Sequence, residues 1–446
     1  MRSSSSILLF LVGLGSITQF HFVGSIGLSE LPIFLLAPIV FLLDFKQLKK
    51  DGFLPFVGLS ILACVGCLIS SIINETPGII FIKGLANPYS IFAVTVILHR
   101  LLRNNFNGLK FFLIGVFLSS IISIFIFQQE TFTVHHGEIN TGDVATEMVM
   151  SYPLFWSAKI KQLLSLPSCT HYLPMPLSYS AGACLVSAFV YLFYSGSSGR
   201  AAALATFAST VLILVFKKSR RQMQKMGRHV ILLGFAVLLA LMAFKFGYSF
   251  AASSGLLGYD VQQKYFSQTR MGSGALQMLM SGRMEFFCAV LACLDHPIVG
   301  FGPRGEDTEG YVERYLQKYG APEDYVSYVN YNYRVAMENG YVYKSIPAHS
   351  YIGMFWVYYG IFGLVIWIYV LWIFYLYLRK YAAAIPQWFG YVAWNMPLMV
   401  WDIFFSPYGG RVSGPSIVVC VLFAKAVTER KMCLPPEMEI DASKWD

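Results

Sequence analysis

The sequence predicts an all-α, polytopic membrane protein of about 12 transmembrane helices with a helical cap on one face. Two observations lead to this fold class. Hydrophobic residues make up 56% of the 446 residues and charged residues only 13%, too few for the surface of a soluble protein of this length. Apolar runs of roughly 15 to 25 residues recur along the whole chain, and this length spans a bilayer. Such spans are expected to be helices, because lipid offers the backbone no hydrogen-bond partner.

We expect a single membrane domain over residues 1–446. The first apolar run is preceded by one cation, Arg2, and lacks a clear small-residue cleavage site, so we interpret it as a retained helix and not as a signal peptide. The predicted spans are, in chain order, 7–27, 31–44, 53–73, 80–98, 109–128, 143–158, 177–195, 201–216, 230–250, 350–378, 385–404 and 413–427.

Basic residues gather in alternate connections between these spans, and the positive-inside rule therefore fixes the orientation. With all of them in the cytoplasm, both chain termini lie inside. The placement in short loops also explains the formal charge of +9 without a nucleic acid partner. The basic residues are Lys46, Lys49, Lys50, Arg100, Arg103, Lys110, Lys217, Lys218, Arg220, Arg221, Lys225, Arg228, Arg379, Lys380, Lys425, Arg430 and Lys431.

Segment 143–158 is the unusual span. It is short and carries Glu147, but the orientation of its neighbours requires a crossing here, and Lys159 and Lys161 agree with an inward exit. A re-entrant segment is the alternative.

The long polar segment 251–349 falls on the outer side in this topology. From Ala275 to Leu294 its apolar residues follow near-helical spacing, which predicts an amphipathic helix on or in the membrane surface. A glycine-rich turn over 300–305 and a polar, tyrosine-rich stretch come next. We therefore expect a periplasmic cap inserted between two spans.

Two arginines on the outer side are candidates for anion binding. Arg200 follows a Ser/Gly turn at a predicted helix start, where free backbone N–H groups and the positive helix end attract anions. Arg283, in Ser281-Gly282-Arg283, precedes the cap helix and can hold a phosphate bidentately. The alternatives are an interfacial arginine for Arg200 and an ion pair with Glu285 for Arg283.

His349 is the candidate general base. It stands where the polar segment ends and an apolar run begins, and the ordinary pKa of histidine is close to neutral. A histidine satisfied by backbone and water at a helix start is the alternative. Asp402 lies near the outer end of a span, where a carboxylate is costly and needs a partner or a task; the same holds for Glu147.

Four residues on this side are assigned to substrate binding: Arg304, Arg334, Arg411 and Asp402. Lys344 is a further cation there, and a solvated or headgroup-facing charge is the alternative for each of these cations. We expect neither a metal nor another cofactor. His135, His136 and Asp143 lack ligand spacing. The CxxC pair Cys64 and Cys67 lies mid-span, where small residues serve helix packing.

Arginines and one histidine on the outer face suit transfer from a lipid pyrophosphate donor. Arginines hold the pyrophosphate and stabilise the charge that grows as it leaves. A base removes the proton from the acceptor hydroxyl that attacks the anomeric carbon.

Four motifs in this order resemble the bacterial O-antigen ligase and O-antigen polymerase superfamily of polytopic glycan transferases. The resemblance covers roughly residues 177–380, and the first half is similar only in being apolar helices. The motifs are Ser195 to Arg200, Ser281-Gly282-Arg283, Asp295-His296-Pro297-Ile298-Val299-Gly300-Phe301-Gly302, and Ala348-His349-Ser350 ahead of Tyr359-Gly360-Ile361-Phe362-Gly363.

The resemblance implies a C-type, inverting, metal-independent glycosyltransferase in the bacterial inner membrane, with its active site facing the periplasm. Its donor would be an undecaprenyl-pyrophosphate-linked oligosaccharide, bound through Arg200 and Arg283, with His349 as the base. Its acceptor would be a lipid-linked repeat unit (polymerase) or lipid A-core (ligase), with membrane lipids and a chain-length regulator as further partners to consider.

Ser350 stands where many ligases carry Asn, which leaves the two activities open. His349-Ser350 and the stretch Phe405 to Arg411 favour the polymerase, because they resemble exopolysaccharide-cluster members more. A lipid-linked oligosaccharide flippase is the alternative from another class. It is disfavoured because most spans lack mid-span charge and the chain shows no internal repeat.

Overall fold

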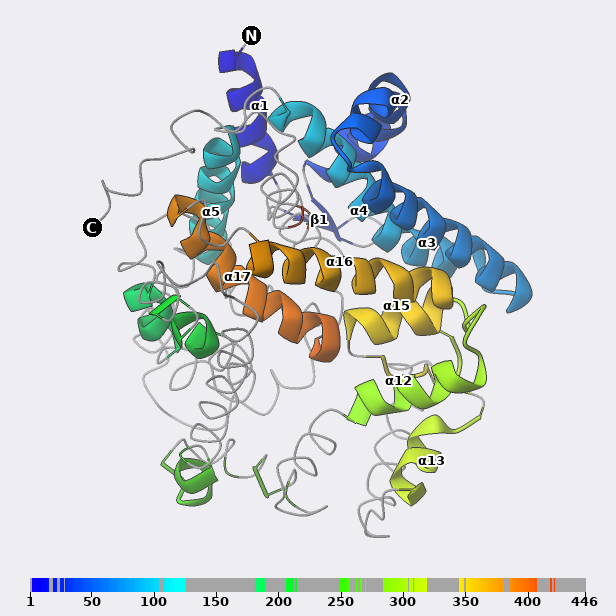
Figure 1. Cartoon of the computed structure of the whole chain (residues 1–446). Coiled ribbons are helices and arrows are strands. Elements are labelled where there is room, and N and C mark those ends of the chain that lie inside the picture. The colour runs from blue at the N-terminus through cyan, green and yellow to red at the C-terminus, as the bar shows by residue number, and fades with distance from the viewer. Residues whose placement is uncertain are drawn as a thin grey trace.

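The computed structural model describes residues 2–15, 19–21, 25–27, 29–103, 108–125, 181–188, 284–303, 305–307, 309–318, 345–348, 350–380 and 386–406, with short runs or single residues within 206–214, 247–269 and 418–421. This part of the chain is mostly helical (Figure 1). Its two short strands, β1 (Gln19–His21) and β2 (Ser25–Gly27), pair antiparallel.

Three helices of the described residues are long and apolar enough to cross a membrane: α2 (Glu30–Lys50), α3 (Leu54–Ile73) and α4 (Gly78–Leu102). They confirm that the predicted segments 31–44, 53–73 and 80–98 are span-length helices. α2 and α4 run in the same direction, because the Tyr89 hydroxyl donates to the Phe34 carbonyl (2.7 Å) while the Phe41 and Phe92 rings meet further along (5.6 Å).

The C-terminal ends of α2 and α4 are joined by a buried carboxylate. Asp44 is 4% exposed and accepts hydrogen bonds from Arg100 and from Arg103, the latter at 2.9 Å. Asp44 sits within an apolar helix, where an unpaired carboxylate is unfavourable, so its two arginine partners determine which helices pack here. The predicted cytoplasmic cations at the ends of these helices therefore lie at the same end of the α2–α4 unit.

A second buried pair lies beside the first. Asp51, in the turn after α2, is 2.9 Å from Nε2 of the fully buried His99 in α4. The Gln47 side chain donates to both oxygens of Asp51, at 2.9 and 3.0 Å. The ring of Phe53, at the start of α3, covers His99 (5.1 Å). This polar cluster thus links α2, α3 and α4 at one end.

The first predicted span, 7–27, does not form one helix. Instead, α1 (Arg2–Leu14) stops well short, and the strand pair follows. α1 packs against α5 (Leu109–Phe125) with Gly13 against Phe112 and Gly115 against Phe10, so the two helices run antiparallel. The topology predicted them parallel, and one of the two directions is therefore wrong. Glycines decide this pairing, because they let the two backbones approach closely.

The predicted span 350–378 is also divided. The structure has α15 (Tyr351–Tyr359), a reversal at Gly360, and α16 (Ile361–Lys380) returning alongside α15 (Figure 1). Nine residues of helix are only about 13 Å long, so α15 is too short to cross a bilayer. The prediction of one continuous span is wrong because Gly360 takes a left-handed φ of 64°, which ends the first helix.

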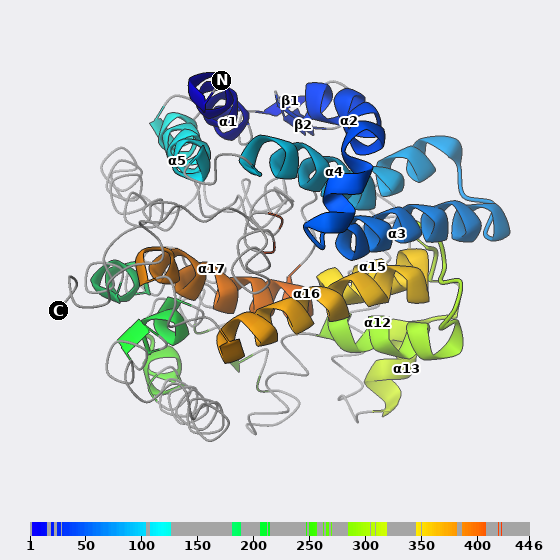
Figure 2. The ribbon, with the colours of Figure 1, turned by 45° about the horizontal axis from the view of Figure 1, so that its top comes forward.

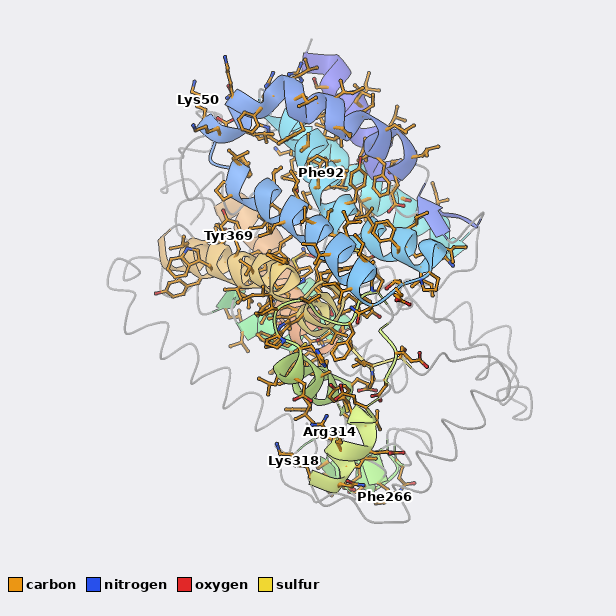
Figure 3. All side chains as sticks on the ribbon, turned by 90° about the vertical axis from the view of Figure 1, so that its right-hand side faces the viewer. Lys50, Phe92, Phe266, Arg314, Lys318 and Tyr369 are labelled. Atoms are coloured by element: carbon orange, nitrogen blue, oxygen red, sulfur yellow. The ribbon has the colours of Figure 1, made fainter. Side chains whose placement is uncertain are left out.

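The remaining described helices form successive layers against this hairpin. α16 lies on α3, where Tyr369 stacks on Phe56 at 6.0 Å, and α15 contacts α3, α16 and α12 (Met284–Asp295). α13 (Tyr311–Lys318) covers α12 on the far side. Figure 2 shows this order, and Figure 3 shows side chains filling the layers from Phe92 down to Arg314.

Other predictions are met in part. α12 lies within the expected amphipathic stretch 275–294 apart from its last residue, and α17 (Pro386–Phe405) matches the span 385–404. Within 177–195 and 201–216, residues 181–188, 206–211, 213 and 214 are helical. Segment 143–158 lies outside the described residues, as do most residues of 230–250 and 413–427.

We expect Asp44→Ala to lower the free energy of unfolding by about 1–3 kcal/mol, because two arginines lose their carboxylate and one of them is itself partly buried. Thermal unfolding of the detergent-solubilised protein measures the change. Glu313→Ala, at an exposed position on α13, is the control and should leave the midpoint unchanged. Equal midpoints for both variants would contradict the role given to Asp44.

Candidate functional site

Two motifs far apart in the sequence meet in the structure: the loop of residues 296–302 (the 296–302 loop) and the reversal between α15 and α16. The Phe301 N–H donates to the Val357 carbonyl (2.7 Å), and the Ile361 N–H donates to the Ile298 carbonyl (3.1 Å). The indole N–H of Trp356 donates to the Pro297 carbonyl (3.0 Å). Both motifs therefore build one junction, in which the loop holds the end of α15 and the start of α16.

Glycines make this junction sterically possible. Gly300 and Gly360 have φ values of 74° and 64°, which L side chains rarely adopt. A Cβ atom at Gly360 would lie 1.9 Å from the Ile298 carbonyl oxygen, and one at Gly300 would lie 2.6 Å from that of Val357. The glycines of these two motifs are thus explained by the close contact of one backbone with the other.

The ends of α3 and α4 complete the junction. The Ser70 hydroxyl donates to the Tyr358 carbonyl (2.7 Å), and the Asn74 amide donates to the Gly300 carbonyl (3.3 Å). The Tyr359 hydroxyl donates to the carbonyl of Gly84 in α4 (2.7 Å). The connection after α3 and the 296–302 loop, both predicted to be on the outer side, are therefore neighbours. Sequence reasoning missed Ser70 and Asn74, because nothing local marks contacts with residues 288 and 226 positions further along the chain.

At the opposite end of α15, three helix ends come together; we call this place the helix-end junction. α12 and α15 run in the same direction, because Gly353, near the start of α15, faces Ala289 in the middle of α12, and Trp356, near the end of α15, donates to the Pro297 carbonyl beyond the end of α12. Their N-terminal ends therefore lie side by side, and α17 ends beside them (Figure 1). The Phe286 ring is 6.4 Å from Phe404 and 5.7 Å from Phe405.

The start of α15 is well defined. Ser350 is fully buried and caps the helix, because its hydroxyl accepts a hydrogen bond from the Gly353 N–H (2.9 Å). A few residues earlier, the Ile346 N–H donates to the Gly305 carbonyl (2.9 Å). This bond holds the segment before α15 against the residues that follow the 296–302 loop. The serine after the candidate base is therefore structural here: it begins the helix.

Of the predicted site residues, the structure describes one. Asp402 is 8% exposed and lies in the last turn of α17, the helix that ends at the helix-end junction. The others lie outside the described residues: Arg200, Arg283, Arg304, Arg334, His349 and Arg411. Glu147, His135, His136, Asp143 and Lys344 lie outside them as well. In the sequence, Arg283 directly precedes α12 and His349 directly precedes the cap of α15.

The helix ends at the helix-end junction favour the binding of an anion. The N-terminal ends of α12 and α15 each present backbone N–H groups and a positive partial charge. Asp402, in the last turn of α17, is 8% exposed, and the Phe286 ring of α12 meets the Phe405 ring of α17. Helix N-terminal ends that lie together in this way can bind an anion such as phosphate.

A second polar group lies at the far end of α12 and is exposed. Arg314 donates to Asp295 (2.8 Å) and to Glu309 (3.3 Å), and His296 is 3.3 Å from Glu309. The hydrogen bond to Asp295 raises the pKa of Arg314 above its ordinary value. Burial, followed by the bond to Glu309, raises the pKa of Tyr311. Exposed pairs of this kind add little stability, and no three His, Cys, Asp or Glu side chains within the described ranges are grouped to hold a metal.

Gly360→Ala is expected to destabilise the protein by at least about 2 kcal/mol, because the new methyl group meets the Ile298 carbonyl and the φ is strained. Gly58→Ala in α3 is the matched control: its Cβ atom meets nothing within 4 Å. Thermal unfolding of purified variants, with the amount of folded protein in membranes, measures both. A Gly360→Ala variant as stable as Gly58→Ala would show that the contact between the 296–302 loop and the α15–α16 reversal does not need this glycine.

No protein-family model, curated protein or solved structure matches the chain. What these residues do is therefore inferred from the motifs and from the geometry described above.

Proposed function

We propose that the protein is an inner-membrane glycosyltransferase that moves an oligosaccharide from an undecaprenyl-pyrophosphate donor to a glycan acceptor at the periplasmic face. The observation that carries the proposal is the helix-end junction. α12 and α15 start side by side where α17 ends. The residue before α12 is Arg283, the residue before the cap of α15 is His349, and Asp402 is in the last turn of α17.

In the proposed reaction Arg200 and Arg283 bind the donor pyrophosphate, helped by the positive ends of α12 and α15. His349 takes the proton of an acceptor hydroxyl, whose oxygen bonds to the anomeric carbon from the face opposite the leaving group. The bond from that carbon to the pyrophosphate oxygen breaks, and undecaprenyl pyrophosphate departs with its charge stabilised by the arginines. Attack from the opposite face inverts the anomeric configuration.

The other candidate residues are assigned to substrate binding. In this proposal Asp402 also binds the substrate, accepting hydrogen bonds from glycan hydroxyl groups, because a buried carboxylate in a span needs a partner or a task. Arg304, Arg334 and Arg411 would contact the charged or hydroxylated parts of the glycan. Among the two acceptors, we favour a lipid-linked repeat unit, which makes the protein an O-antigen or exopolysaccharide polymerase; lipid A-core would make it a ligase.

The test is complementation in two hosts, one lacking its O-antigen ligase and the other its polymerase, with lipopolysaccharide and lipid-linked glycan resolved on gels. Long chains restored only in the polymerase-null host are the expected result. Glycan on lipid A-core only in the ligase-null host would identify a ligase instead. His349→Ala and Arg283→Ala should each abolish the restored banding, because base catalysis and charge stabilisation each contribute about 100-fold or more.

Arg314→Ala is the matched control. This arginine lies in the same outer segment, but its ion pairs are exposed and lie at the end of α12 opposite the helix-end junction. It should restore banding at the level of the unchanged protein. All variants are compared at equal amounts in the membrane. If His349→Ala or Arg283→Ala restored the glycan bands to the level of the unchanged protein, the proposed mechanism would be wrong. Movement of labelled donor across liposomes without glycosidic bond formation would replace it with a flippase.

A further inference from the structure

We infer that Ser70, at the outer end of α3, is a positioning residue for the proposed transfer: it fixes the end of α15 and thereby the place where α15 starts, next to His349 in the sequence. The inference rests on the proposed function for its effect on rate, but its structural part is independent of it. Ser70 has no place in the motifs and would not touch the reacting atoms.

The contact of Ser70 is unusual for a serine in an apolar helix. Its hydroxyl is fully buried and donates to the carbonyl of Tyr358, 288 residues along the chain, at 2.7 Å. That carbonyl lies in the last turn of α15, where helix carbonyls have no partner within the helix. In a lipid-surrounded position such a carbonyl must be satisfied by a neighbour. The hydroxyl of Ser70 therefore supplies a bond that the end of α15 needs.

Ser60 provides a contrast within the same helix. It is also fully buried, but its hydroxyl bonds the carbonyls of Phe56 and Val57 in its own helix, at 3.3 and 2.8 Å. Ser70 likewise approaches its own helix, at Cys67 (3.2 Å), yet its shorter bond goes to α15. Two serines of equal burial thus differ in one respect, the link to α15.

Fixing one end of α15 fixes the other. α15 is an uninterrupted helix of nine residues, so its start lies about 13 Å from its end and moves with it. Because α15 does not span the bilayer, lipid does not set its depth. Its position depends instead on Ser70, on the 296–302 loop and on the packing against α12 and α16. A displacement of about 1 Å at a reacting group can lower a rate about 100-fold.

The experiment compares Ser70→Ala, Ser70→Thr and Ser60→Ala in the full chain, with purified lipid-linked donor and acceptor in nanodiscs. Ser70→Ala should lower kcat about tenfold or more with KM for the donor unchanged, because geometry and not binding is altered. Ser70→Thr keeps the hydroxyl and should retain most of kcat. Ser60→Ala should match the unchanged protein. Equal kcat for Ser70→Ala and Ser60→Ala would overturn the inference.

Hydrogen–deuterium exchange of the same samples, read by mass spectrometry without substrate, gives the second measurement. Peptides covering residues 351–361 should exchange faster in Ser70→Ala and not in Ser60→Ala. Unchanged exchange in Ser70→Ala would overturn the inference whatever the activity. If the unchanged protein transfers no glycan but exchange rises as expected, the proposed function falls while the link between Ser70 and α15 stands.

Discussion

The close contact between the backbone at Ile298 and the backbone at Gly360 is the constraint on which the described structure depends. The two backbones are so close that a Cβ atom at Gly360 would clash with the Ile298 carbonyl, and one at Gly300 would clash with the Val357 carbonyl. The contact reverses the chain between α15 and α16, and the adjoining bonds of Phe301 and Trp356 tie the reversal to the loop after α12. Together with the packing of Gly353 against Ala289, these contacts make α12 and α15 run in the same direction, with their starts close together.

Hydrogen bonding explains why so many polar contacts gather around a helix as short as α15. A helix that crosses the bilayer exposes its last carbonyls to headgroups and water, but α15 ends against protein. Three of its last four carbonyls, those of Trp356, Val357 and Tyr358, accept hydrogen bonds from Gly360, Phe301 and Ser70. At its start, the Ser350 hydroxyl accepts a hydrogen bond from the Gly353 N–H. The short helix is thus stable because its surroundings replace the water that it lacks.

The sequence predicted much of this fold where the physical signal is local. Long apolar runs identified α2, α3 and α4, and the sign of the charges placed the ends of α2 and α4 together. Where the result depends on distant partners, the prediction failed. The run around Gly360 is apolar on both sides, so hydropathy shows one span, and only the loop at Ile298 explains the reversal. The paired glycines of α1 and α5 oppose the predicted direction for the same reason. For the candidate site, one motif pointed to the 296–302 loop and the cost of a carboxylate in a span pointed to Asp402, whereas Ser70 and Asn74 needed the structure.

The carboxylate of Asp44 has a consequence for the order in which the helices assemble during synthesis. Its partner Arg100 lies 56 residues further along the chain. At a synthesis rate of about 5–20 residues per second, α2 has to wait roughly 3–11 s for that partner to be made. During this interval Asp44 lacks the two arginines that pair with it in the folded protein. We therefore expect α2 to reach its final position only after α4 has been made, so that α2, α3 and α4 assemble as one unit.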